Sequence, residues 1–123
     1  MIKLLAIGIG GFIGALLRYG VSGWIYSLGK SSFPSGTLSV NIAGSFALGL
    51  IAALSGRYII HPNLKLFLTI GVLGAFTTFS TFSYETVMLL QLNSYLKAFL
   101  NVAFSVLFGL AAAFLGLAAG KLL

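Results

Sequence analysis

The sequence predicts an all-α integral membrane protein built as one domain of four transmembrane helices. Hydrophobic residues make up 59% of the 123 positions and charged residues only 7%, which is far too apolar for a soluble domain of this size. A membrane-spanning helix needs about 20 apolar residues, so the chain has room for about four spans joined by short loops. Short polar segments divide the apolar sequence at suitable intervals.

Those polar segments define the four spans. The first is expected at about residues 4–28, because its apolar run is too long for a signal peptide and no small-residue cleavage site follows a short core. The segment "GKSSFPS", with Pro34, forms the first loop and leads to a second span at about 36–55. After "GRYIIHPN" a third span covers about 65–90, and after "QLNSYLK" a fourth covers about 98–122.

The basic residues indicate a membrane partner. The formal net charge is +6, but the seven Lys and Arg residues stand singly and form no cluster for nucleic acid, so we expect them to contact membrane lipid instead. Four spans put both termini on one side. The cations on that side are Lys3, Arg57, Lys65 and Lys121, and those toward the other side are Lys30, Lys97 and Arg18. This weak bias suits insertion in both orientations, a dual topology, although a single orientation is also possible.

The chain lacks several residue types and motifs, and their absence reduces the number of possible function classes. The chain has no cysteine, which excludes disulfides and thiolate metal sites. It has no Walker-type phosphate loop and no nucleophile elbow, so we do not expect an enzyme. Glu85 is the only carboxylate side chain, whereas a cation pore or cation exchanger normally needs carboxylates along its path.

Polar residues share helical faces in the second and fourth spans. Thr37 and Asn41 lie four residues apart, Ser45 extends their face, and Asn101 and Ser105 have the same spacing. An amide in hydrocarbon costs free energy unless it is hydrogen-bonded. These side chains could therefore form interhelical hydrogen bonds worth about 1 kcal/mol each. They could equally be donors along a conduction path, and the sequence leaves both interpretations open.

The third span contains the stretch "GAFTTFSTFSYE", residues 74–85. Gly71 and Gly74 precede a run of Thr and Ser, and both Gly and Thr weaken helix continuity. We predict a helix break midway along this span, which a membrane tolerates where the freed backbone is buried or lines a cavity. Freed carbonyls at such a break can coordinate a hard cation such as Na⁺. The alternative is an intact helix whose hydroxyls bond back to their own carbonyls.

Two rings and two charged residues have alternative roles. Phe79 and Phe82 lie among the hydroxyls, next to Ser83; they could simply pack, or their positive ring edges could weakly attract an anion. Glu85 could bind a proton or cation, accept hydrogen bonds, or lie near a pore end. Arg18 could extend toward the interface or draw anions into a vestibule by its field.

Small residues form stripes that allow close helix contact. One pair is Gly10 and Gly14, and a second stripe in the fourth span consists of Ser105, Gly109, Ala113, Gly116 and Gly120. These stripes could pack within one subunit or form a dimer contact. Four helices can hardly enclose a polar pathway alone, which favours an oligomer.

Three segments together carry a family resemblance: "GGFIGALLRY" (10–19), "GTLSVNIAGSF" (36–46) and "GAFTTFSTFSYE" (74–85). They resemble the signature segments of the CrcB/Fluc family of small fluoride channels, and the similarity spans nearly the whole chain. The resemblance implies an antiparallel homodimer of dual-topology subunits in the cell membrane. It implies two pores, each built from both subunits, through which fluoride leaves the cytoplasm passively.

The resemblance also implies roles for individual residues. The residues implied for the anion pathway are Asn41, Phe79, Phe82, Ser105, Glu85 and Arg18, with the hydroxyls of Thr37 and Ser83 as further donors. Gly74 and Thr77 would offer backbone carbonyls to a structural Na⁺ at the dimer axis. Some relatives carry a tyrosine where this chain has Asn101, so its role in the path is less defined.

Two other functions compete with the fluoride channel. A small multidrug-type exporter shares the length and the four spans, but it needs a carboxylate in its first span, and Glu85 lies in the third. A non-transporting membrane scaffold would use every polar group to join helices and would conduct no ion.

Overall fold

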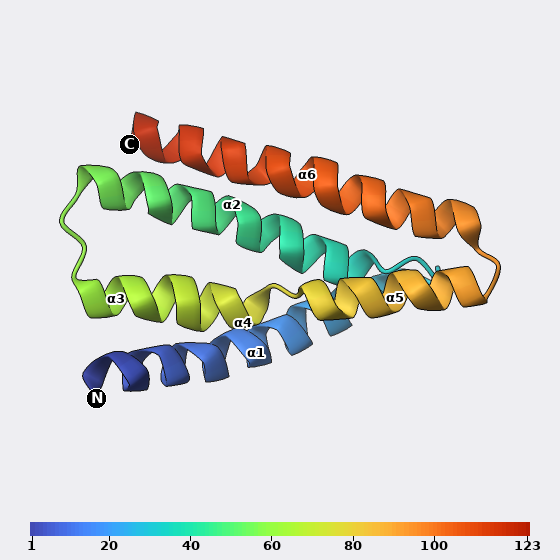
Figure 1. Cartoon of the computed structure of the whole chain (residues 1–123), viewed down its shortest axis with the longest axis horizontal. Helices are drawn as coiled ribbons and strands as arrows, with labels where there is room; N and C mark the ends of the chain where they lie inside the picture. Colours follow the sequence, from blue (N-terminus) through green and yellow to red (C-terminus); the bar gives the residue numbers. More distant parts are fainter.

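The computed structural model describes residues 1–123 as four long helical spans joined by short connections (Figure 1). These are α1 (Ile2–Leu28), α2 (Ser35–Arg57), a composite third span (Pro62–Gln91) and α6 (Tyr95–Leu122). All four are long and apolar enough to cross a membrane, which confirms the predicted all-α membrane fold. Each helix extends at most three residues beyond the range expected from hydropathy.

The third span is interrupted, as predicted. It consists of α3 (Pro62–Leu66), the π-helix η1 (Phe67–Leu73), the short α4 (Gly74–Phe76) and α5 (Phe79–Gln91). Thr77 and Thr78 between α4 and α5 have extended backbone conformations. The π-helical segment was not predicted. It adds a second irregularity directly before the break, in the kind of segment that is often found at functional sites.

The chain ends lie at one end of the bundle. In Figure 1 both termini and the α2–α3 connection lie at the left, and the 29–34 and 92–94 connections lie at the right. The side assignment of the cations expected from the sequence is therefore confirmed: Lys3, Arg57, Lys65 and Lys121 lie toward the termini, and Lys30 and Lys97 lie at the opposite end.

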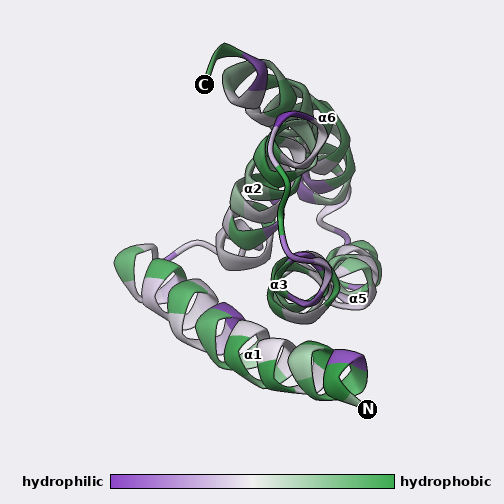
Figure 2. Cartoon of the chain, turned by 90° about the vertical axis from the view of Figure 1, so that its left-hand side faces the viewer, coloured by the Kyte–Doolittle hydropathy of each residue, from purple (hydrophilic) through white to green (hydrophobic).

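The helices pack as two pairs, α2 with α6 and α1 with the η1–α4 segment (Figure 2). Glycines form both contacts. A methyl group at Gly14 would overlap the backbone of Val72, and one at Gly116 would overlap the carbonyl of Phe46. The glycines of both stripes thus serve packing within the chain. Gly109 is the exception, because a methyl group there would have only the Ser45 hydroxyl nearby, 4.0 Å away.

Large apolar side chains are exposed on all four spans, and hydrophobic residues, coloured green, occur along the helices in Figure 2. Only 15 of 123 residues are buried, so the chain has almost no hydrophobic core of its own. In lipid no such core is required, because apolar side chains are as well solvated outside as inside. Close helix packing and side-chain hydrogen bonds between helices hold the bundle together instead.

Candidate functional site

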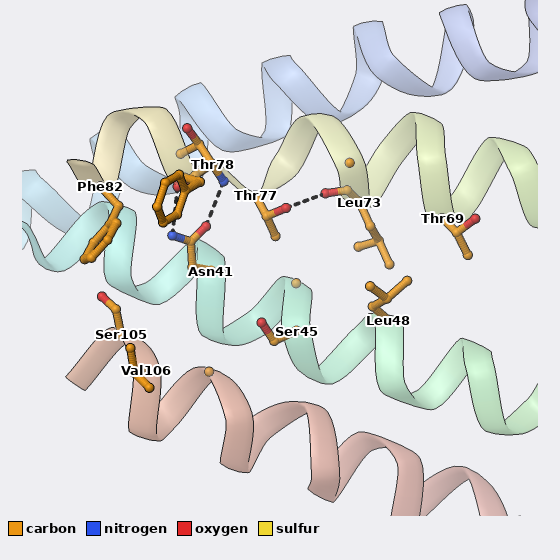
Figure 3. A pocket seen from close by; sticks show the side chains of 14 residues that line it. Asn41, Ser45, Leu48, Thr69, Leu73, Thr77, Thr78, Phe82, Ser105 and Val106 are labelled. Carbon is orange, nitrogen blue, oxygen red and sulfur yellow. Dashed lines mark hydrogen bonds between the residues drawn. The ribbon is translucent and has the colours of Figure 1, made fainter. Parts of the chain in front are cut away.

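A groove of about 360 Å³ lies between α2, the third span and α6. Figure 3 shows its lining, where Asn41, Thr77 and Thr78 meet on one side and Phe82 and Ser105 on another. The groove brings together six of the ten residues that the resemblance assigns to the anion pathway or the cation site. They are Asn41, Gly74, Thr77, Phe79, Phe82 and Ser105. None of its 14 lining residues is charged, so every polar group in it is neutral.

The helix break forms one wall of this groove. Thr78 is the N-cap of α5, and its hydroxyl accepts the backbone N–H of Thr81 at 3.1 Å. The same hydroxyl donates to the Thr81 hydroxyl at 3.0 Å and contacts that of Ser80 at 3.2 Å. The cluster of hydroxyl residues therefore replaces backbone hydrogen bonds that a continuous helix would have made.

The side chain of Asn41, on α2, hydrogen-bonds to the backbone at the helix break. Its Nδ2 donates to the carbonyl of Thr78 at 3.0 Å, and its Oδ1 accepts the Thr78 N–H at 2.8 Å. One side chain thus satisfies both backbone groups of a residue that has left the helix. The amide has two N–H groups, and this pairing uses one. Asn41 is therefore an interhelical hydrogen-bonding residue that also lines the groove, so the two interpretations left open by the sequence are compatible.

Backbone carbonyls lose their helical partners at the break, and those of Gly74 and Thr77 are among them. In a continuous α-helix the carbonyl of Gly74 would accept the N–H of Thr78, and that of Thr77 would accept the N–H of Thr81. The Thr78 N–H donates to Asn41 instead, and the Thr81 N–H donates to the Thr78 hydroxyl. These are the two carbonyls that the resemblance singles out as cation ligands. No group of His, Asp or Glu side chains could hold a metal ion.

Aromatic rings and an unpaired hydroxyl face the other part of the groove. The ring centroids of Phe79 and Phe82 lie 5.6 Å apart with an angle of 45° between the rings. Phe79 is 79% exposed in the single chain, so most of its ring is uncovered apart from the contact with Phe82. The Ser105 hydroxyl is buried and has no hydrogen-bond partner in the chain. It therefore retains a donor for a ligand in the groove.

A second polar cluster forms around Glu85, outside the groove. Glu85 Oε1 accepts the hydroxyl of Tyr26 at 2.7 Å and that of Thr37 at 2.9 Å, and the two hydroxyls are 3.0 Å apart. Of the roles considered for Glu85, the chain itself supports that of hydrogen-bond acceptor. Sequence reasoning missed Tyr26 as a site residue. In the structure Tyr26 also packs on Gly36, where a methyl group would overlap its ring.

The remaining predicted residues lie apart from the groove. The Ser83 hydroxyl donates back to the carbonyl of Phe79 at 2.9 Å, and buried Asn101 donates to the hydroxyl of Thr86 at 2.9 Å. Asn101 therefore joins α5 to α6. Arg18 is half-buried on α1 and lines neither the groove nor the cavity beside Glu85.

This geometry suits a small, strongly hydrated solute. The groove offers hydroxyl and amide donors, two released carbonyls and ring edges, and it has no charged group that would hold an ion tightly. It contains no nucleophile with an adjacent base. Its neutral polar groups can bind a polar solute reversibly.

Comparison with known proteins agrees with this geometry. The family described as "CrcB-like protein, Camphor Resistance (CrcB)" matches residues 5–117. "Fluoride-specific ion channel FluC 1" of Methanosarcina acetivorans is 50% identical over 117 residues, which is 94% of this chain and 88% of the relative. "Fluoride-specific ion channel FluC" of Geotalea daltonii is 48% identical over 122 residues, 98% of each chain. The protein of the same name from Geotalea uraniireducens is 48% identical over the full length of both. The chain therefore belongs to the CrcB family.

Proposed function

We propose that the chain is a fluoride-selective ion channel through which fluoride leaves the cytoplasm passively. The observation that carries this proposal is that relatives 45–50% identical to the chain, aligned over most of its length, are named fluoride-specific ion channels. The neutral, donor-bearing groove supports it, because a channel must bind its ion well enough to admit it and weakly enough to release it.

The lining chemistry suits fluoride. Fluoride is small, strongly hydrated and a good hydrogen-bond acceptor, so a pore must replace part of its water shell with donors. The free Ser105 hydroxyl and the second N–H of Asn41 are such donors. The edges of Phe79 and Phe82 add weak attraction, since the edge of an aromatic ring is positive.

A passive pore is sufficient for export. Hydrogen fluoride crosses membranes as the uncharged acid and ionises in the less acidic cytoplasm. A membrane potential that is negative inside then favours exit of the anion by about 2.3 kcal/mol per 100 mV. No energy source or enzymatic step is required.

We further propose that two chains form an antiparallel, dual-topology homodimer in the cell membrane, with two pores. The open groove supports a partner, because its polar groups would otherwise face lipid. The weak charge bias between the two ends of the bundle supports insertion in both orientations. Each pore would then combine the groove of one subunit with residues of the other.

The carbonyls of Gly74 and Thr77 are proposed to hold a structural Na⁺ at the dimer axis. Their donor chemistry fits, since both lose their helical partners and oxygen is the ligand that a hard cation prefers. The ion would supply positive charge that joins the two helix breaks across the subunit contact. The chain's own part is to keep both carbonyls free, through Asn41 and the Thr78 hydroxyl.

The test is fluoride efflux from liposomes that contain the purified protein, with chloride efflux as the paired control. Fast fluoride release with little chloride release is expected. No release from protein shown to be folded and dimeric would contradict the channel and favour the scaffold. Transport that requires a proton gradient and is abolished by Glu85→Gln would favour the exporter instead.

A further inference from the structure

A second cavity, at the end of the bundle opposite the termini, is not part of the groove. It has a volume of about 280 Å³ and is walled by the end of α1, the 29–34 connection and α5. Glu85 lies in its wall, with Oε1 bonded to Tyr26 and Thr37 and with Oε2 buried and unpaired. Ser32 lies in the loop wall.

A polar side chain of α2 links the wall of this cavity to the helix that lines the groove. Thr37 donates to Glu85 in the cavity wall, and Asn41, four residues further along α2, lines the groove. One helical turn, about 6 Å along the helix axis, separates these two polar side chains. The polar cluster at the second cavity therefore lies one turn of α2 away from a donor of the groove.

A lysine is held at the rim of this cavity. Lys97 Nζ donates to the hydroxyl of Ser32 at 2.6 Å. The same loop is attached to α6 a second time, because the rings of Phe33 and Phe104 meet edge to face with centroids 6.3 Å apart. These contacts hold the ammonium group at the mouth. Ser105, two turns further along the same side of α6, lines the groove.

We propose that this cavity is the entrance of the anion pathway and that the charge of Lys97 concentrates anions there. This proposal rests on the proposed channel function. Glu85, the chain's only carboxylate side chain, lies in the cavity wall and would by itself repel an approaching anion. The ammonium of Lys97 is hydrogen-bonded to Ser32, which lines this cavity, and its positive charge offsets that repulsion. Arg18, the candidate from the sequence, lies outside this cavity.

The expected size of the effect follows from Coulomb's law. A unit positive charge about 10 Å from an anion, at an effective dielectric constant between about 40 and 80, enriches that anion about two- to fourfold. The screening length is about 30 Å at 0.01 M salt and about 3 Å at 1 M, so the enrichment should vanish at high ionic strength. A purely structural role of Lys97 would show no such dependence on salt.

The experiment compares initial fluoride efflux at low fluoride concentration from vesicles of neutral lipid. Ionic strength is set to about 0.01 M or about 1 M with a salt whose ions do not permeate, so that the screening length changes about tenfold. Lys97→Gln removes the charge but retains a hydrogen-bond donor for Ser32, and Lys97→Arg retains both. Lys30→Gln is the matched control, because Lys30 lies at the same end of the bundle and is exposed, whereas Lys97 is the lysine bonded to Ser32 of the cavity wall.

We expect Lys97→Gln to slow efflux about two- to fourfold at low ionic strength and to have no effect at high ionic strength. Lys97→Arg should match the wild type, and Lys30→Gln should have the smaller effect. A Lys97→Gln rate equal to the wild type at low salt, or reduced equally at both salt concentrations, would overturn this inference and leave the channel intact. Absence of fluoride efflux from the wild type would overturn the channel and the entrance together.

Discussion

The hydrogen-bond pair between Asn41 and Thr78 gives a quantitative prediction for Asn41→Ala. The substitution removes the bonds of 3.0 and 2.8 Å and leaves the backbone N–H and carbonyl of Thr78 unpaired. Thr78 is only 8% exposed, and an unpaired buried polar group costs about 1–3 kcal/mol. Water in the groove can replace part of the loss, so we expect the free energy of unfolding to fall by about 2–4 kcal/mol.

Asn101→Ala is the matched control, since it removes the same side chain from a site that is 1% exposed. There a single bond of 2.9 Å to the Thr86 hydroxyl is lost, and that hydroxyl keeps its own bond to a backbone carbonyl. The expected cost is about 0.6–1 kcal/mol, typical of interhelical side-chain bonds in membranes.

The assay for both variants is equilibrium unfolding in mixed micelles, titrated with a denaturing detergent and followed by far-ultraviolet circular dichroism. Amide hydrogen exchange at Thr78 and Thr81 localises the change, and both amides should exchange faster in Asn41→Ala alone. If Asn41→Ala destabilises the protein no more than Asn101→Ala, the side chain does not brace the break and the reasoning is refuted.

Three further predictions concern the pore, the packing and the cation. Phe79→Ile and Phe82→Ile should each sharply reduce fluoride efflux while gel filtration still shows the dimer; normal efflux from both would remove these rings from the pathway. Gly116→Ala should prevent stable folding, because its methyl group would overlap the backbone of Phe46, whereas Gly109→Ala has 4.0 Å of clearance and should fold normally; detergent unfolding curves compare the two. Replacement of Na⁺ by a large organic cation during purification should weaken the dimer and fluoride efflux together, and unchanged dimer and efflux would contradict the carbonyl site.

Hydropathy located the four spans because lipid selects apolar runs of the required length. The predicted spans were shorter than the observed helices, which continue into the flanking polar segments. α3 begins at Pro62, in a polar segment, where His61 Nδ1 accepts the N–H of Asn63 at 3.2 Å. α2 continues to Arg57, and the guanidinium of that residue donates to the carbonyl of Lys121 at 3.0 Å. Polar side chains can complete a helix end outside the hydrocarbon, and hydropathy does not detect them.

The partners at the site could not be predicted in the same way. Asn41 and Thr78 are 37 positions apart, and Tyr26 and Glu85 are 59 apart, so neither pair leaves a local pattern. The π-helix η1 likewise has no periodic signature. The helix break in the third span could be predicted from the sequence because it depends on local composition. The side chain of Asn41, which pairs with the backbone at the break, comes from another helix and could not be predicted in this way.

The helix break and the side chains that pair with its backbone groups together explain why hydroxyl residues occur in the middle of an apolar span. An unbroken third helix would pair every backbone group and offer a ligand only side chains. The break exposes backbone groups, and it is tolerated because Asn41 and the Thr78 hydroxyl pair with the N–H groups that would otherwise be unsatisfied. Because those N–H groups donate to side chains, the carbonyls of Gly74 and Thr77 lose the donors that a continuous helix would provide. The residues that interrupt the helix are therefore the residues that make this part of the membrane span polar enough to receive an ion.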